Sequence, residues 1–138
     1  MLRVIESVPS METTYRRYNL KNSAAIIVGD LVLVGGLTAV DYDSGEVLSG
    51  GDFRFVAERA IDVVLRVLAD IDGDLALGLD HVVKVNAFVP DPANFPVWNE
   101  AFLAAFQPPY PCRTTVCSPL AFGDIELDVT ASLIPRRT

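Results

Sequence analysis

A two-strand hairpin with apolar side chains on both faces constrains the fold of this chain more than any other feature. Two runs of β-forming residues, 24–28 and 31–36, are joined by Gly29-Asp30, which is typical of a two-residue hairpin turn. Successive side chains of a strand point to opposite faces, and in both runs the two alternating sets are apolar. Because such strands are normally buried on both sides, the hairpin needs cover over both faces of its sheet.

The rest of the chain predicts two helices, over 52–71 and 95–106, and three more strands, over 81–89, 114–118 and 125–134. In the helices, we expect the buried stripes to be Val56, Ala60, Val63, Val64, Val67 and Ile71, and then Val97, Phe102, Ala105 and Phe106. In the first and last of the three strands, the expected core faces are Val83, Val85, Ala87 and Val89, and then Ile125, Leu127, Val129, Ala131 and Leu133.

The element order β-β-α-β-α-β-β predicts an α+β domain with both helices on one face of a single sheet. The length of 138 residues suits one domain, 1–138, and the first twenty residues are mixed and polar, with no clear element. Two helices cover only one face of the sheet. We therefore expect the other face to pack against another copy of the chain in a closed homo-oligomer.

Composition and charge narrow the class of partner. Hydrophobic residues make up 51% of the chain and charged residues 21%, which is typical of a folded globular protein. Eleven basic and eighteen acidic residues give a formal charge of −7, which repels phosphate backbones, so nucleic acid is not expected as a partner. No apolar run is long enough to span a bilayer, and the N-terminus lacks a secretory signal, so we expect a cytoplasmic protein with no membrane partner.

Few residues are available for a metal or a cofactor. The two cysteines, Cys112 and Cys117, lie at an odd offset on one expected strand and so point to opposite faces. The only histidine is His81, and zinc needs more ligands. Nucleotide-binding and serine-hydrolase motifs are absent from the sequence. We therefore predict a site without metal or cofactor.

Arg113 is the first candidate for function. It follows the proline-rich loop 107–111 and enters a predicted strand, so its backbone is held. Its guanidinium is a permanently charged planar fork that matches a small carboxylic acid. We expect Arg113 to border the sheet face that needs a partner, although arginines at strand starts are more often surface or ion-paired residues.

Glu126 is the second candidate. It starts a polar row that continues through Asp128 on the last strand, and such a row is either solvated or, at an interface between copies, able to carry protons. Two further residues have both an ordinary interpretation and a functional one. Asn99 is a helix-surface amide, and Gly36 ends a strand, where glycine marks a bulge or the close approach of a ligand.

Several segments in a fixed order resemble the Rid family of small trimeric enamine/imine deaminases, also called the YjgF family. The resemblance runs from about residue 22 to 133, and its marks are 28–36, 38–41 with Gly45-Glu46, 81–89, 95–100, 111–116 and 126–131. It implies a chorismate-mutase-like fold in a homotrimer. It also implies ligand sites in the clefts between subunits.

The resemblance also implies roles for individual residues. Arg113 matches the arginine that holds the substrate carboxylate, and Glu126 matches the glutamate that orients or activates water. Gly36 matches the glycine that lines the site. Thr115 stands two positions after the arginine, and Asn99 matches a helix asparagine that faces the cleft.

The chain also departs from the family pattern. Gly35-Gly36-Leu37 stands where Ser-Gly-Gln is usual, and Asn22 replaces a common tyrosine, although Tyr18 lies near it. An ungapped comparison puts Asp128 at the acid position. We prefer Glu126, because Glu-Leu-Asp-Val-Thr-Ala matches the family ending better.

Together these observations predict a hydrolase. It would convert reactive 2-imino or 2-enamino carboxylic acids into 2-oxo acids and ammonia, with Arg113 as carboxylate anchor and Glu126 as proton carrier. Two alternatives stay open. One is a deaminase specific for an aminomuconate-type acid, and the other is a non-catalytic trimer that binds small carboxylates.

Overall fold

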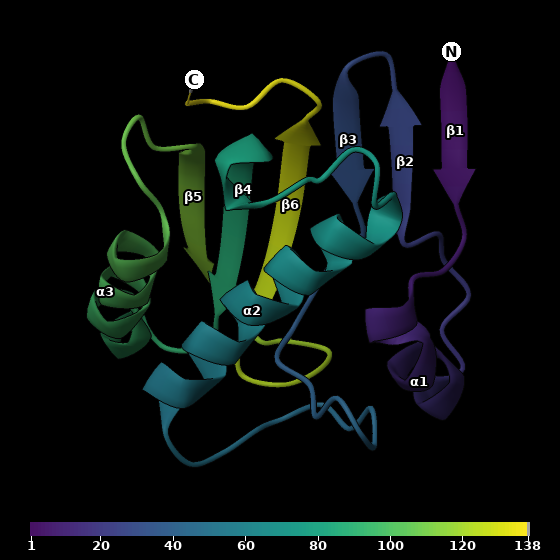
Figure 1. The fold of residues 1–138 in the computed structure, drawn as a ribbon. Helices are drawn as coiled ribbons and strands as arrows, with labels where there is room; N and C mark the ends of the chain where they lie inside the picture. Colours follow the sequence, from purple (N-terminus) through teal and green to yellow (C-terminus); the bar gives the residue numbers. More distant parts are fainter. Residues whose placement is uncertain (138) are drawn as a thin grey trace.

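Six strands form one sheet in the order β1-β2-β3-β6-β4-β5 (Figure 1). The computed structural model describes residues 1–137. All neighbouring strands are antiparallel except β4 and β5, which are parallel. The strands are β1 (Leu2–Ile5), β2 (Ala25–Val28), β3 (Leu31–Val34), β4 (Val82–Val89), β5 (Cys112–Cys117) and β6 (Glu126–Ser132).

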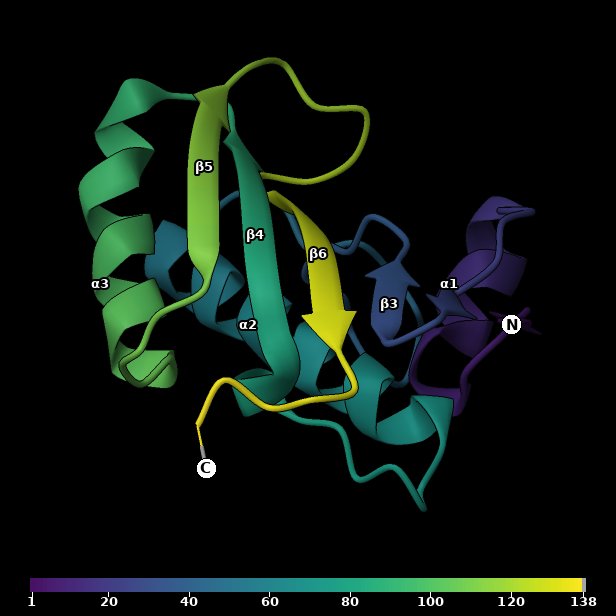
Figure 2. The ribbon, with the colours of Figure 1, turned by 90° about the horizontal axis from the view of Figure 1, so that it is seen from above.

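Helix α2 (Phe53–Ile71) crosses one face of the sheet, and α3 (Phe95–Ala105) lies near β5 (Figure 1). Short 3-10 turns, η1 (Leu79–His81) and η2 (Pro92–Asn94), precede β4 and α3. After β6, the C-terminal segment runs back past the start of β4 (Figure 2). Within residues 1–137, no helix is both long enough and apolar enough to cross a membrane. The predicted α+β class with a single sheet is confirmed.

The N-terminal twenty residues correct the prediction, because they form strand β1 and a third helix, α1 (Pro9–Tyr18). Helix α1 is mostly polar and buries only Met11 and Thr14, so its apolar stripe is too narrow to give a clear period. Strand β1 lies at the sheet edge beside β2, with Leu2 and Val4 exposed. An exposed four-residue edge strand carries little pattern that could be recognised.

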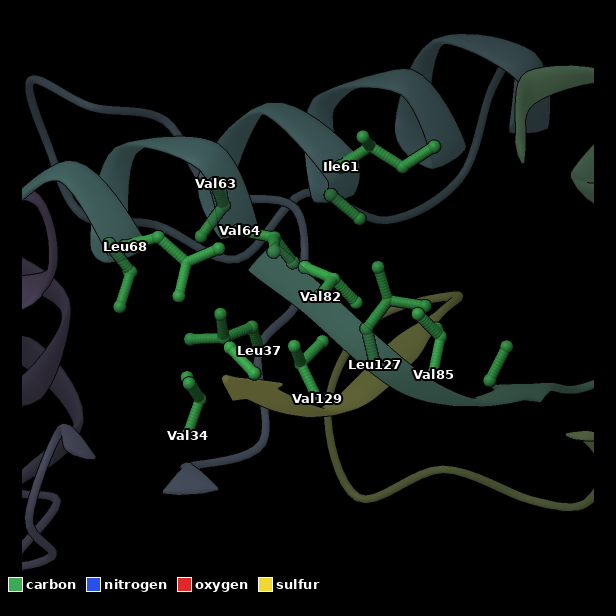
Figure 3. Packing of buried hydrophobic residues seen from close by; sticks show 14 of the residues in the cluster. Val34, Leu37, Ile61, Val63, Val64, Leu68, Val82, Val85, Leu127 and Val129 are labelled. Carbon is green, nitrogen blue, oxygen red and sulfur yellow. The ribbon is translucent and has the colours of Figure 1, made fainter. Parts of the chain in front are cut away.

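The hydrophobic core lies between α2 and the sheet (Figure 3). All six predicted core residues of α2 are buried. Among them, Val63 and Val64 face sheet residues such as Val34, Val85 and Leu127 (Figure 3). A fully buried valine or leucine contributes about 1.5–3 kcal/mol, so this layer holds the sheet and helices in place.

Two predicted core faces are partly wrong. A register shift between Val82 and Lys84 makes an irregularity in β4, so Val82 is buried and Val83 only half-buried. Such an extra residue changes the side to which the next side chains point. In α3 the buried residues are Trp98, Ala101 and Phe102, whereas Val97 and Ala105 are half-buried.

The sheet face away from α2 has no helix over it within residues 1–137, as expected when the helices cover only one face, and we call it the open face. Its half on β1, β2 and β3 is apolar and exposed, through Leu2, Val4, Val28, Leu31 and Leu33. Its half on β6, β4 and β5 is more polar and includes Asp128, Asn86 and Thr114.

Candidate active site

Strand β5 carries Arg113 on the helix-covered face of the sheet. Arg113 pairs with Val85 of β4, and Val85 is buried beneath the helices. The expectation that Arg113 borders the open face is therefore wrong, because alternation along β5 turns its odd-numbered side chains toward α3. The Arg113 Cζ atom lies 4.1 Å from the centroid of the Phe102 ring, and Nη2 donates a hydrogen bond to Asn99 Oδ1.

The Arg113 guanidinium is held in one orientation, but not all of its hydrogen-bond donors have partners. Burial lowers its pKa, but arginine stays charged at any pH that proteins tolerate. Its Nη1 is buried and has no hydrogen-bond partner within residues 1–137. A buried donor without a partner costs about 1–3 kcal/mol, and a carboxylate is its natural partner. The arrangement is therefore suited to binding an anion.

A groove of about 470 Å³ runs in front of this guanidinium, and we call it the arginine groove. Arg113, Thr115 and Cys117 line it from β5, because residues two apart on a strand share a face. Its other lining residues are Val89, Pro92 and Phe95. Thr115 and Arg113 therefore share a groove open to solvent, and the Asn99 amide contacts Arg113.

Glu126 lies in a second, separate cavity of about 220 Å³, which we call the glutamate cavity. The carboxylate is packed against Gly36: a β-carbon added to Gly36 would lie 3.3 Å from both Cδ and Oε1 of Glu126. The other lining residues are Met11, Thr14, Tyr15, Tyr18, Leu20, Asn22, Thr38, Val47 and Phe122. Gly36 therefore leaves the space that the carboxylate occupies.

The two predicted acid positions differ in their surroundings. Asp128 is exposed, and its Oδ2 accepts a long hydrogen bond of 3.4 Å from Asn86 Nδ2. Glu126 is half-buried and lines the glutamate cavity. Of the two carboxylates, only Glu126 therefore has an enclosed space beside it.

Polar groups of the glutamate cavity remain available to a ligand. The Tyr18 hydroxyl accepts a hydrogen bond of 2.8 Å from the Val47 backbone N–H, so its own proton is free to be donated. Thr38 Oγ1 is buried without a partner within residues 1–137. The rings of Tyr18 and Phe122 meet edge to face at 5.4 Å and form an apolar wall.

Comparison with known proteins identifies the family of this chain. The family model described as endoribonuclease L-PSP matches residues 16–133. The chain belongs to this family, also known as the YjgF/RidA family. The resemblance noted in the sequence is therefore confirmed.

Similar members of the family include a named deaminase and two proteins of solved structure. A 2-iminobutanoate/2-iminopropanoate deaminase of Dermatophagoides farinae is 30% identical over 94 residues, which cover 68% of this chain and 70% of the relative. The solved structure of protein YjgH has a TM-score of 0.77 at 29% identity and covers 96% of this chain and 97% of that one. For RidA from an Antarctic Psychrobacter the TM-score is 0.67 at 27% identity, with 80% and 86% covered.

Sequence reasoning missed part of this family member's glutamate cavity. Tyr18 was only noted as lying near Asn22, whereas the structure puts both in the cavity wall. Thr38 enters the sequence analysis only within segment 38–41, with no role in the site, and Phe122 is not singled out. The hydroxyl of Thr38, two residues after Gly36, was a usable signal, but Phe122 lies in the loop between β5 and β6, where no period points to a cavity.

Arg113 and Glu126 lie on opposite faces of the sheet in one copy of this YjgF/RidA family chain. Arg113 pairs with Val85, and Glu126 pairs with Phe88. Val85 and Phe88 are three residues apart on β4, and an odd offset means opposite faces. In a single chain, the arginine groove and the glutamate cavity therefore do not face each other.

Proposed function

We propose that this protein hydrolyses 2-imino and 2-enamino carboxylic acids to 2-oxo acids and ammonia. The site is formed when the arginine groove of one copy meets the glutamate cavity of another. The observation that carries this proposal is the buried Arg113 Nη1, which has no partner within residues 1–137. The deaminase name of the Dermatophagoides farinae relative supports the choice of reaction.

Carboxylate binding comes first in the reaction. The substrate carboxylate accepts hydrogen bonds from Arg113, whose guanidinium is held in plane by Asn99 and by the Phe102 ring. This fixes the imine carbon at one distance from the attacking water, and such orientation lowers the entropic part of the barrier. An enamine first accepts a proton on carbon and becomes the imine.

Proton transfer through Glu126 completes the reaction. Its carboxylate takes a proton from water while the water oxygen bonds to the imine carbon. Glu126 passes this proton to the imine nitrogen, which gives a neutral carbinolamine. It then takes the carbinolamine hydroxyl proton and delivers it to nitrogen as the C–N bond breaks, so ammonia leaves and the 2-oxo acid remains. Thr38 and Tyr18 have free hydroxyl hydrogen-bonding capacity in the same cavity and hold the water.

The opposite faces of Arg113 and Glu126 support a site divided between two copies. The apolar half of the open face, which includes Leu31 and Leu33, supplies a contact surface for another copy. We propose a cyclic homotrimer, as the family resemblance implies, with one composite site at each contact.

Subunit mixing tests the composite site. Arg113→Ala and Glu126→Gln subunits are each expected to be inactive alone, with ammonia release from fresh 2-iminobutanoate reduced about 10²-fold or more. Co-refolded in equal amounts, they should recover about one quarter of wild-type activity, because one contact in four joins two intact halves. Mixed assemblies that form but remain inactive would refute the division of the site.

A non-catalytic carboxylate-binding trimer is the main alternative, and Glu126→Gln separates the two functions. The variant should still bind 2-oxobutanoate in calorimetry while ammonia release is lost. Unchanged ammonia release in Glu126→Gln would exclude the hydrolytic role of this residue.

Ribonuclease activity, which the family description names, is not part of this proposal. The chain carries a net charge of −7, which repels a phosphate backbone. Incubation of the purified protein with labelled RNA should leave the RNA intact. Cleavage that disappears in Arg113→Ala would favour the ribonuclease instead.

A larger, less polar substrate is favoured by the size of the glutamate cavity. It measures about 220 Å³ and has Tyr18, Phe122 and Val47 in its wall, and a cavity of roughly 150 Å³ is enough to bind benzene. The imine of phenylalanine should therefore be hydrolysed at least as efficiently as that of alanine. Val47→Phe should reduce kcat/KM for the larger substrate about 10-fold more than for the smaller. An equal reduction of kcat/KM for the two substrates would argue against this preference. The aminomuconate-type alternative also calls for a larger substrate, so the same comparison tests it.

A further inference from the structure

Arg136 is a buried arginine that the reaction described above does not use. Its side chain is 7% exposed, which is unusual for a charged residue without a close ionic partner. Within residues 1–137, its nearest carboxylate is that of Asp80, at 3.9 Å. The guanidinium is satisfied instead by four backbone carbonyl groups, those of Pro109, Leu79, Val82 and Gln107.

These hydrogen bonds join two segments that are far apart in sequence. Nε donates to Pro109 at 2.8 Å and Nη2 to Gln107 at 3.2 Å, in the loop that leads into β5. Nη1 donates to Leu79 and Val82, at 2.7 and 2.6 Å, where η1 passes into β4. The C-terminal segment reaches this position by running back past the start of β4 (Figure 2). Arg136 thus fixes the loop before Arg113 to the neighbouring strand.

A second connection runs through aromatic rings. The Arg136 Cζ atom lies 5.8 Å from the centroid of Phe106. Phe106 stacks on Phe102 at 4.6 Å with an angle of 24° between the rings. Phe102 in turn carries the Arg113 guanidinium at 4.1 Å. Arg136 therefore supports both the backbone that leads to Arg113 and the ring on which its guanidinium rests.

We propose that Arg136 is a positioning residue that fixes the carboxylate-binding geometry of Arg113. The inference rests on the proposed role of Arg113 as carboxylate anchor. Arg136 itself does not touch the substrate. A planar fork with five donors can satisfy four carbonyl groups at once, whereas an ammonium with three donors on a flexible stem cannot.

Arg136→Lys is the informative substitution, because it keeps the charge and much of the buried stem. We expect a folded protein with the KM for 2-iminobutanoate raised about 10-fold or more and kcat changed much less. Affinity for 2-oxobutanoate should fall by a similar factor. The matched control is Arg137→Ala, since Arg137 is 45% exposed and lies at the same 3.9 Å from Asp80. This control should behave as wild type.

A double-mutant cycle separates positioning from a general structural effect. If Arg136 acts through Arg113, adding Arg136→Lys to Arg113→Ala should not reduce 2-oxobutanoate affinity further. Additive losses, or wild-type affinity in Arg136→Lys, would overturn the inference. If Arg113→Ala itself binds normally, the proposed function fails instead, so the two failures are distinguishable.

Phe106→Leu provides a second route if Arg136→Lys does not fold. It keeps an apolar side chain but removes the ring between Arg136 and Phe102. The same rise in KM and the same lack of additivity with Arg113→Ala are expected. A folded Phe106→Leu variant with wild-type KM would contradict the aromatic part of the connection.

Discussion

At the scale of single residues, Gly36 shows how closely the glutamate cavity is fitted. A β-carbon at this position would lie 3.3 Å from Cδ and Oε1 of Glu126, a tight contact that forces the carboxylate to move. We expect Gly36→Ala to reduce kcat about 10- to 100-fold with little change in the free energy of unfolding. Ammonia release and urea unfolding measure the two quantities.

Gly73→Ala is the control for this substitution. An added β-carbon there meets nothing within 4 Å, so activity should stay at the wild-type level. A Gly36→Ala variant with full activity would mean that the position of the Glu126 carboxylate does not matter.

At the scale of elements, the turn before Val47 is packed against α1. Gly45 has a φ of +76°, and a β-carbon there would lie 2.7 Å from Thr13 C and Thr14 N. The Thr14 hydroxyl also donates to the Gly45 carbonyl at 2.9 Å. Gly45→Ala should therefore lower the free energy of unfolding by about 3 kcal/mol or more, as measured by urea titration.

Gly50→Ala isolates the backbone contribution to that loss. Gly50 has almost the same φ, +77°, but an added β-carbon meets nothing within 4 Å. Gly50→Ala should therefore lower the free energy of unfolding by only about 1 kcal/mol. Equal losses at the two glycines would mean that packing against α1 contributes nothing.

The ion pair that joins β1 to the end of α2 predicts a dependence on pH. Arg3 Nη1 lies 2.9 Å from Asp72 Oδ2, and this hydrogen bond, followed by the one from the Asp74 N–H, lowers the pKa of Asp72 below its ordinary 3.8. A lowered pKa adds stability above about pH 4, which is lost as the pH falls through the folded-state value. Between pH 5 and pH 2, Asp72→Asn should therefore lose less stability than wild type in urea titrations. If the free energy of unfolding fell equally with pH in wild type and in Asp72→Asn, this prediction would be contradicted.

How far sequence predicts this fold depends on how regular each element is. Helix α2 shows its period over 19 residues and every predicted core position is buried. Helix α1 buries only Met11 and Thr14, and its signal is lost among polar residues. The irregularity at Val83 depends on hydrogen bonding between strands, which local pattern does not record.

At the scale of the whole molecule, the open face predicts association. Leu33 is 45% exposed in the middle of the apolar half, opposite Ile26 and Thr130. A charge there should oppose burial against another copy, so Leu33→Lys should give a monomer in light scattering and abolish ammonia release. Leu65, which is 39% exposed on α2, is the matched control. Leu65→Lys should keep the assembly, and an intact assembly in Leu33→Lys would exclude this face as the contact.

The site was harder to predict from sequence than the fold. The residue types at 113 and 126 are the basis of the proposed chemistry, but the face to which each points depends on strand register. Arg113 was expected at the open face and lies beneath α3 instead, beside Asn99. Phe122 comes from a loop, and its contact with Tyr18 at 5.4 Å depends on tertiary packing alone.

Because Arg113 and Glu126 lie on opposite faces of the sheet, the proposed activity should depend on protein concentration. If the site forms between copies as proposed, a lone chain carries both groups but no reaction centre, so newly made chains are inert until they meet others. Specific activity should therefore fall steeply on dilution below the association threshold and return on concentration, so the rate per molecule would depend on the amount of protein present.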